Sequence, residues 1–149
     1  MLFRSKSLGT ATQIGIALGV ALAYRGTDKL VVDLQPDGDL LFDAGALWIA
    51  THHQIPLLVV MYNNRAYYND WEHQIRIARQ RGTDEGKAHI GMEIAKPAPD
   101  FAKMAQAFGW YAEGPIERPD EVRAAVARAA RVVKEEKRPA LVDTVTQFR

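Results

Sequence analysis

Two short polar pairs, Asp37-Gly38 and Asn63-Asn64, enclose a segment whose pattern predicts a turn, a helix and a buried strand. Carboxylate and amide oxygens are ligands that a hard cation such as Mg²⁺ accepts, and Mg²⁺ in turn binds phosphate oxygens. Gly38 lets a phosphate approach the backbone, and the start of the following helix attracts an anion. The segment therefore predicts a site for a metal ion and a diphosphate.

Helical and strand patterns alternate along the chain, which is typical of an α/β fold with a mainly parallel sheet and helices on both faces. Helices are predicted over residues 9–24, 44–53, 68–81, 99–108 and from 119 onward, and strands over 29–35, 57–62, 110–112 and 140–146. We find no internal repeat, low-complexity tract or linker. One domain over residues 1–149 is expected.

Several positions within these elements carry specific expectations. Gly15 and Gly19 are expected to let the first helix approach the sheet, since the glycines do not follow a strand as a dinucleotide fingerprint requires. Asp43 is placed to cap the second helix, and Trp48 within that helix is expected in the core. The pair at residues 52–53, both histidines, is expected to be partly buried and to offset the helix dipole.

Composition excludes several classes of function. The 149 residues are 48% hydrophobic and 25% charged, with a formal net charge of +1, so no basic surface for nucleic acid or for an anionic membrane is expected. The chain has no cysteine, which rules out disulfides and thiolate ligands, and its four histidines lack the spacing of a zinc motif. No apolar run reaches the length of a membrane span or a secretory signal, and we expect a cytoplasmic protein.

The segment from Gln35 to Asn64 resembles the signature of thiamine-diphosphate-dependent enzymes. That signature comprises a Gly-Asp-Gly triplet, a helix, a strand entered through a hydrophobic residue and proline, and a closing Asn-Asn; this chain has Pro36-Asp37-Gly38, Ile55-Pro56 and Asn63-Asn64. The other interpretation is that the first pair is an ordinary turn and the second an ordinary loop start. The resemblance covers nearly the whole chain, although its N-terminal part is short relative to the diphosphate-binding domain of the family.

The resemblance implies a set of binding residues. Asp37 and Asn64 correspond to side-chain ligands of Mg²⁺, and the backbone carbonyl of Ala66 to a third ligand. The residues implied to contact thiamine diphosphate are Gly9, Thr10, Asp37, Gly38, Asp39, Asn64, Ala66 and Tyr67. Two departures are visible, because Pro36 replaces the first glycine and Asp39 adds a carboxylate that must face away from a diphosphate.

Residues 65–98 form a long polar segment that is rich in arginine and glycine. A connection of this length inside a compact domain is usually functional or disordered. In the family this region lies over the diphosphate and the substrate cleft, which implies that Arg65, Tyr67, Tyr68, Trp71 and His73 lie near the chemistry. The arginines at positions 76, 79 and 81 are interpreted as a solvated helix face.

Within the family, the run Asn63 to Tyr67 is most similar to the acetolactate synthase, benzaldehyde lyase and 2-oxoacid decarboxylase branch. This branch implies a lyase or transferase acting on a 2-oxoacid or an aldehyde. The alternatives are a subunit of a 2-oxoacid oxidoreductase and a non-catalytic fragment that binds cofactor or a partner.

The resemblance also implies a partner. In the family a second, pyrimidine-binding domain, usually on another subunit, supplies the glutamate that activates the cofactor. No glutamate of this chain has that context, so no residue is assigned a catalytic role. The chain alone is expected to be inactive and to form a homo- or hetero-oligomer.

Overall fold

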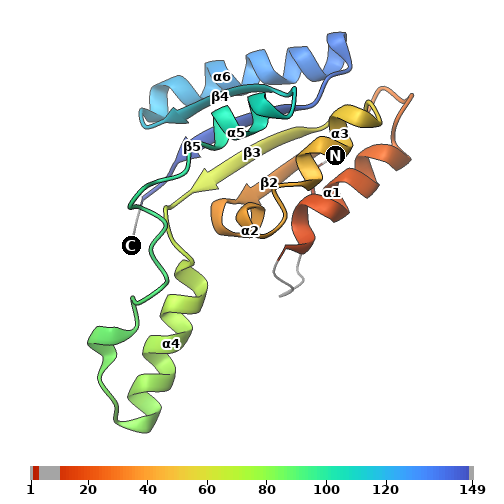
Figure 1. Cartoon of the computed structure of the whole chain (residues 1–149). Helices are drawn as coiled ribbons and strands as arrows, with labels where there is room; N and C mark the ends of the chain where they lie inside the picture. Colours follow the sequence, from red (N-terminus) through yellow and green to blue (C-terminus); the bar gives the residue numbers. More distant parts are fainter. Residues whose placement is uncertain (1, 4–10, 148–149) are drawn as a thin grey trace.

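The computed structural model describes residues 2–3 and 11–147, which contain a five-stranded sheet in the order β1-β2-β3-β5-β4 (Figure 1). All neighbouring strands are parallel. The strands are β1 (Leu2–Phe3), β2 (Val32–Pro36), β3 (Leu58–Asn63), β4 (Tyr111–Ile116) and β5 (Ala140–Val145). The predicted α/β class with a mainly parallel sheet is confirmed.

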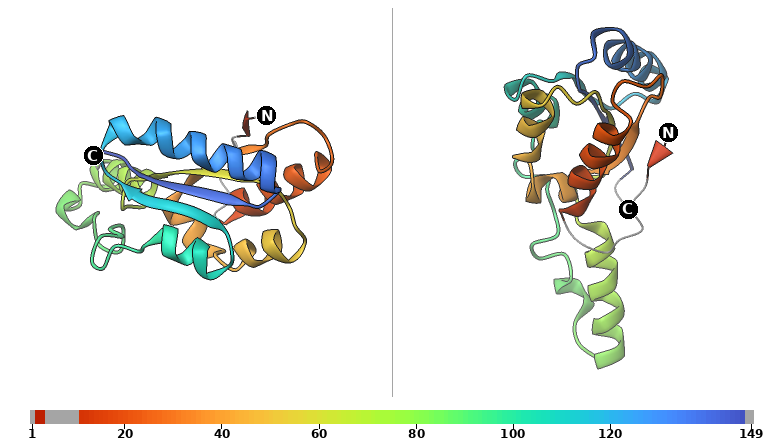
Figure 2. Two further views of the ribbon diagram at one scale, coloured as in Figure 1. Left: turned by 90° about the horizontal axis from the view of Figure 1, so that it is seen from above. Right: turned by 90° about the vertical axis from the view of Figure 1, so that its right-hand side faces the viewer.

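Helices cover both faces of this sheet (Figure 2). They are α1 (Thr12–Ala23), α2 (Asp37–Phe42), α3 (Ala46–His52), α4 (Tyr68–Arg81), η1 (Glu85–Lys87), α5 (Phe101–Ala107), α6 (Pro119–Arg131) and the π-helical turn η2 (Val132–Glu136). Residues of α1, α2, α3 and α5 share one buried cluster with the sheet, whereas α6 and η2 share the other.

The strand register determines which side chains face each layer. Asp33 of β2 lies beside Val59 of β3, which lies beside Leu141 of β5, and Val59 and Leu141 belong to the cluster under α1, α3 and α5. Because side chains alternate along a strand, Asp143, two residues after Leu141, faces the same layer. Strands β3 and β5 are buried almost throughout, as expected for strands covered on both faces.

Helix α3 corrects the prediction for Trp48. Leu47 and Ala50 are fully buried against the sheet, and Trp48 is 52% exposed and stacks on His52 with ring centroids 4.4 Å apart. In a helix the neighbouring residue is turned by about 100°, so a buried Leu47 places Trp48 on the outer side. His52 and His53 are also exposed rather than partly buried.

The interpretation of the glycines in α1 is likewise wrong. Ile14, Ala17, Leu18 and Ala21 form the buried stripe of this helix. Gly15 and Gly19 fall on the exposed side, where a Cβ added to either residue would meet no atom within 4 Å. The close helix packing therefore comes from small side chains such as Ala17 and not from the glycines.

The other elements follow the sequence pattern with local differences. The helix predicted over residues 68–81 is confirmed as α4. The helix predicted over residues 44–53 is shorter, since α3 begins at Ala46 without a side-chain cap, and Asp43 instead ends α2. Asp100 caps α5 by accepting a 2.8 Å hydrogen bond from the Lys103 N–H, and β4 continues to Ile116, beyond the predicted end at residue 112.

Helix α4 and turn η1 form an arm that projects from the sheet (Figure 1). Ala78 is the buried residue of α4, and Arg76, Arg79 and Arg81 are exposed, as predicted for a solvated face. Within residues 2–3 and 11–147, no helix combines the length and the apolar character needed to cross a bilayer.

A buried carboxyl group lies inside the α1 side of the core. Asp33 has no exposed surface, and its Oδ1 accepts a 2.7 Å hydrogen bond from Gln13 Nε2, while its Oδ2 has no hydrogen-bond partner. Burial raises the pKa of Asp33 to about 7; the Gln13 hydrogen bond opposes this shift, and the charge of Asp39 adds to it. Asp33 is therefore largely protonated below neutral pH in the folded chain.

This raised pKa predicts that Asp33→Asn stabilises the chain more at pH 8 than at pH 5. Between about pH 4 and 7 the unfolded chain releases a proton that the folded chain keeps, so the wild-type free energy of unfolding falls as the pH rises through this window. The gain of the variant should reach about 2–4 kcal/mol at pH 8. Urea unfolding at both pH values measures it, with the exposed Asp28→Asn as control; an equal gain at both pH values would contradict the assignment.

Candidate functional site

The candidate site lies where β2 and β3 end side by side. Pro36, the last residue of β2, pairs with Tyr62 of β3, so Asp37 and the turn after Asn63 meet at the carboxyl edge of the sheet. Ligands of open parallel sheets bind outside this edge. The tertiary structure therefore brings together the two polar pairs that the sequence singled out.

Asp37 is a buried carboxylate that is incompletely satisfied. It is the first residue of α2 and 2% exposed, and its Oδ2 is buried without a hydrogen-bond partner. Burial raises the pKa of Asp37, although the backbone N–H groups of Gly38, Arg65 and Ala66 lie close enough to lower it in part. The carboxylate thus contacts the turn that carries Asn64, and one oxygen is free to accept a further partner.

The turn after β3 is held by its own side chains. Asn64 Oδ1 accepts a 3.1 Å hydrogen bond from the Ala66 N–H, and Asn63 Oδ1 accepts one of the same length from the Arg65 N–H. Arg65 adopts a φ of 58°, a left-handed conformation that is unfavourable for a residue with a Cβ. Asn63 is 3% exposed, and its Nδ2 donates to Asp143 of β5.

Tyr67 lies directly against Gly38. A Cβ added to Gly38 would lie 2.5 Å from Tyr67 Cε1 and 3.3 Å from Ile94 Cδ1. Two backbone hydrogen bonds of 2.8 Å, from the Tyr67 N–H to the Met92 carbonyl and from the Ile94 N–H to the Arg65 carbonyl, fix the segment that carries this ring. Burial and the nearby charge of Asp37 raise the pKa of Tyr67, so its hydroxyl stays protonated at neutral pH.

Asp39 faces away from this turn, as its charge requires. Its carboxylate accepts hydrogen bonds from the Ala11 N–H (2.7 Å) and the Gln13 N–H (3.3 Å), at the start of α1. The partner of this carboxylate is thus α1, the helix that precedes β2 in the chain. Gly9 and Thr10, the remaining predicted cofactor residues, lie outside the described residues.

The side chains predicted near the chemistry separate into two groups. Arg65 stays close to Asp37, and its Nη2 lies 2.9 Å from Glu117 Oε1. His73 instead lines a cavity of about 310 Å³ between α4 and η1, and the Trp71 ring lies 6.2 Å from that of His89 on the same arm. The sequence analysis did not predict that residues 92–94 pair with residues 65–67 through backbone hydrogen bonds, because these segments are far apart in the chain.

The donor set at this edge fits Mg²⁺. Asp37 offers an unpartnered buried carboxylate oxygen, and the adjoining turn offers the Asn64 amide oxygen and backbone carbonyls, which are the hard ligands that Mg²⁺ prefers. The fit depends on this carboxylate, because α2 has only six residues and adds little dipole. No cluster of three His, Cys, Asp or Glu side chains suited to a metal occurs in the described part of the chain.

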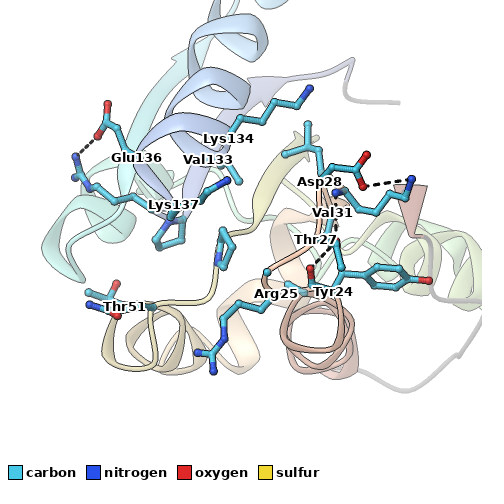
Figure 3. Close-up of a pocket in the computed structure, with 18 of the residues that line it drawn as sticks. Tyr24, Arg25, Thr27, Asp28, Val31, Thr51, Val133, Lys134, Glu136 and Lys137 are labelled. Atoms are coloured by element: carbon cyan, nitrogen blue, oxygen red, sulfur yellow. Dashed lines mark hydrogen bonds and ion pairs between the residues drawn. The ribbon is translucent and has the colours of Figure 1, made fainter.

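A larger cavity of about 620 Å³ lies at the opposite end of the strands (Figure 3). Three of its five basic side chains have a partner: Lys29 pairs with Asp28 at 3.5 Å, Arg138 pairs with Glu136 at 3.0 Å, and Arg25 donates to the His53 carbonyl. Helices α1 and α3 and turn η2 end beside it, and cations offset the partial negative charge of such ends. The cavity does not adjoin Asp37 and is not part of the candidate site.

Comparison with known proteins identifies the class. Residues 3–144 match the family described as thiamine pyrophosphate enzyme, C-terminal TPP binding domain. The Mycobacterium tuberculosis protein IlvX, provisionally named an acetolactate synthase large subunit, is 33% identical over 105 residues, which are 68% of this chain and 19% of that protein. A 2-hydroxyacyl-CoA lyase from Oryza sativa subsp. japonica is 29% identical over 143 residues, 92% of this chain and 22% of that protein.

Solved structures share the fold. A thiamine diphosphate-dependent 4-hydroxybenzoylformate decarboxylase from Rhodococcus jostii superposes with a TM-score of 0.68 and 23% identity, covering 94% of this chain and 24% of that one. Benzoylformate decarboxylase from Polynucleobacter necessarius gives a TM-score of 0.66 and 20% identity, covering 91% and 23%. The chain spans about a fifth of the length of the curated relatives it matches.

These matches define a thiamine pyrophosphate-binding α/β domain. The chain belongs to the family of C-terminal TPP-binding domains of thiamine pyrophosphate enzymes. Its relatives include an acetolactate synthase-like protein and a 2-hydroxyacyl-CoA lyase, and decarboxylases share its fold. The family that the sequence resembles is thereby confirmed.

The contact between Gly38 and Tyr67 predicts that Gly38→Ala destabilises the fold. The new methyl group must displace the Tyr67 ring, and overpacking of this kind typically lowers the free energy of unfolding by about 1–3 kcal/mol. Gly19→Ala, in open space within α1, should instead raise it by up to about 1 kcal/mol. Urea unfolding of both variants measures the difference, and equal stabilities for the two would refute the close contact.

Proposed function

We propose that this chain binds thiamine diphosphate through Mg²⁺ held by Asp37, Asn64 and the backbone carbonyl of Ala66. The observation that carries the proposal is the buried, unpartnered Oδ2 of Asp37 beside the turn that bears Asn64. A bound cation would favour the ionised carboxylate and offset the cost of its burial. The family membership of the chain supports the choice of cofactor.

Gly38 and Tyr67 would receive the diphosphate next to this cation. The absence of a Cβ on Gly38 leaves room for the Tyr67 ring, which keeps both residues beside the Asp37 carboxylate. The Arg65 Nε is buried without a hydrogen-bond partner, and it supplies a second unsatisfied polar atom close to Asp37. The Asp39 carboxylate is directed at the start of α1, so its negative charge would not repel the diphosphate.

We further propose that the chain is the diphosphate-binding part of a 2-oxoacid decarboxylase or carboligase that acts on a 2-oxoacid or an aldehyde. When bound, thiamine diphosphate supplies a carbon nucleophile and an electron sink for such reactions. The chain's own residues hold the diphosphate end and the metal. The names of the relatives, which include lyases and decarboxylases, support this reaction class.

A second domain would complete the site. Large apolar side chains on the outer side of α1, α2 and α3 are exposed, and exposed apolar surface of this kind marks interfaces. They are Ile16 (38% exposed), Leu22 (48%), Phe42 (58%), Trp48 (52%) and Ile49 (41%). We propose that a pyrimidine-binding domain from another subunit packs here or nearby, which would make the active form an oligomer.

Asp37→Asn tests the metal site. The amide preserves the shape of the side chain but removes the charge, so Mg²⁺-dependent binding of thiamine diphosphate should weaken at least about 30-fold, or about 2 kcal/mol. Without Mg²⁺ the variant should be no less stable than the wild type, because it removes a buried charge. Titration calorimetry and thermal unfolding measure both effects.

The matched control for this experiment is Asp43→Asn, an exposed carboxylate at the other end of α2. The control should bind as the wild type does. Binding of thiamine diphosphate that is indifferent to Mg²⁺, or that survives Asp37→Asn unchanged, would show that the assigned ligands are wrong.

The isolated chain is expected to lack turnover. Glu72, the glutamate closest in sequence to the candidate ligands, and Glu93, which pairs with Ala66 in a β-bridge, are both exposed. With thiamine diphosphate and Mg²⁺ we expect neither decarboxylation of pyruvate or benzoylformate nor synthesis or cleavage of acyloins. Assays of CO₂ release and aldehyde consumption measure this. Turnover on the order of 1 s⁻¹ from a sample shown by mass to hold no second protein would contradict it.

A further inference from the structure

A second carboxylate is buried behind the candidate site. Asp143 lies on β5 and has no exposed surface. It belongs to none of the motifs identified in the sequence analysis. A Cβ added to Gly114 of the neighbouring strand would lie 2.7 Å from both the Cβ and the carbonyl oxygen of Asp143. The glycine thus lets β4 approach the backbone of β5 closely at Asp143.

Asp143 determines how the Asn63 amide is oriented. Asn63 Nδ2 lies 3.1 Å from Asp143 Oδ1 and 3.4 Å from Oδ2. An ionised carboxylate can only accept hydrogen bonds, so it must face the NH₂ end of the amide. The oxygen end of Asn63 is then directed at the Arg65 N–H, from which it accepts a hydrogen bond of 3.1 Å.

The hydrogen bond from the Arg65 N–H holds a strained turn. Arg65 has a φ of 58°, which residues with a Cβ adopt at a cost and which persists where the surroundings enforce it. Asn64 and Ala66, the residues on either side, are the proposed metal ligands. If the Asn63 amide rotated, its NH₂ group would face the Arg65 N–H, the hydrogen bond would be lost, and the turn could relax.

We propose that Asp143 is a positioning residue that acts through Asn63 to hold the 63–66 turn in the conformation that presents Asn64 and Ala66 to the metal. The inference rests on the proposed function for its effect on binding. Asp143 has no exposed surface, and this burial raises its pKa to about 6, so the carboxylate lies in surroundings that disfavour its charge. A purely space-filling role would need no charge there.

The test is a rescue by glycine. Asp143→Ala should weaken Mg²⁺-dependent binding of thiamine diphosphate at least 10-fold, measured by titration calorimetry. Because the Arg65 side chain lies beside the proposed site, each double variant is compared with its own Arg65 single variant. In the Arg65→Gly background Asp143→Ala should weaken binding much less, because glycine adopts a φ near 58° without strain. The Arg65→Ala background lacks the same side chain but keeps the strain, so there Asp143→Ala should still weaken binding at least 10-fold.

Hydrogen exchange provides a readout that needs no ligand. The Arg65 amide should be protected from exchange in the wild type. In Asp143→Ala it should exchange at least 10-fold faster, whether or not cofactor binds. If the wild type shows no Mg²⁺-dependent binding, the proposed function fails, and this measurement alone still decides the role of Asp143. If Asp143→Ala does not fold, Asp143→Asn with and without Arg65→Gly is compared in the same way. Unchanged Arg65 protection, or an equal loss of binding on Asp143→Ala in the Arg65→Gly and Arg65→Ala backgrounds, overturns the proposal.

Discussion

The parallel pairing of β2 with β3 is the contact on which the candidate site depends. It places the end of β2 beside the end of β3, and so brings Asp37 against the backbone of Arg65 and Ala66. A shift of one residue in this register would turn every side chain of β2 to the opposite face of the sheet. The hydrogen bond from Gln13 of α1 to Asp33 of β2, and the packing of Val32 on the cluster under α6, oppose such a shift.

Three carboxyl groups, those of Asp33, Asp37 and Asp143, are buried in the half of the domain that holds this edge, and burial raises the pKa of each. Such groups lower the stability of a fold unless they are paired. Asp33 and Asp143 are each bonded to one amide side chain, whereas Asp37 keeps an unpartnered oxygen. Carboxyl groups with perturbed pKa values often gather at functional sites. A cation bound to Asp37 would offset the free-energy cost of burying its carboxylate.

The projecting α4 arm and the exposed apolar side chains suit this domain to packing against other domains. The α4 arm projects from the sheet with one buried residue, and apolar side chains on α1, α2 and α3 remain exposed. The relatives that this chain matches are about five times as long. Exposed apolar surface and a site open at the edge of the sheet have the same explanation in our proposal, since one partner domain would cover both.

Local chemistry in the sequence was enough to predict the α/β class and the α4 helix, because turn residues and apolar periodicity act over a few positions. It also singled out Asp37, Gly38 and Asn64, whose binding roles stay a prediction. It was insufficient for Trp48 and for Gly15 and Gly19, where the rotation of a helix against the sheet decides which side is buried. Asp143 and Asn63 are 80 residues apart in the chain. Only the pairing of β3 with β5 places them in contact, and a buried hydrogen bond between distant residues leaves no periodic signal in the sequence.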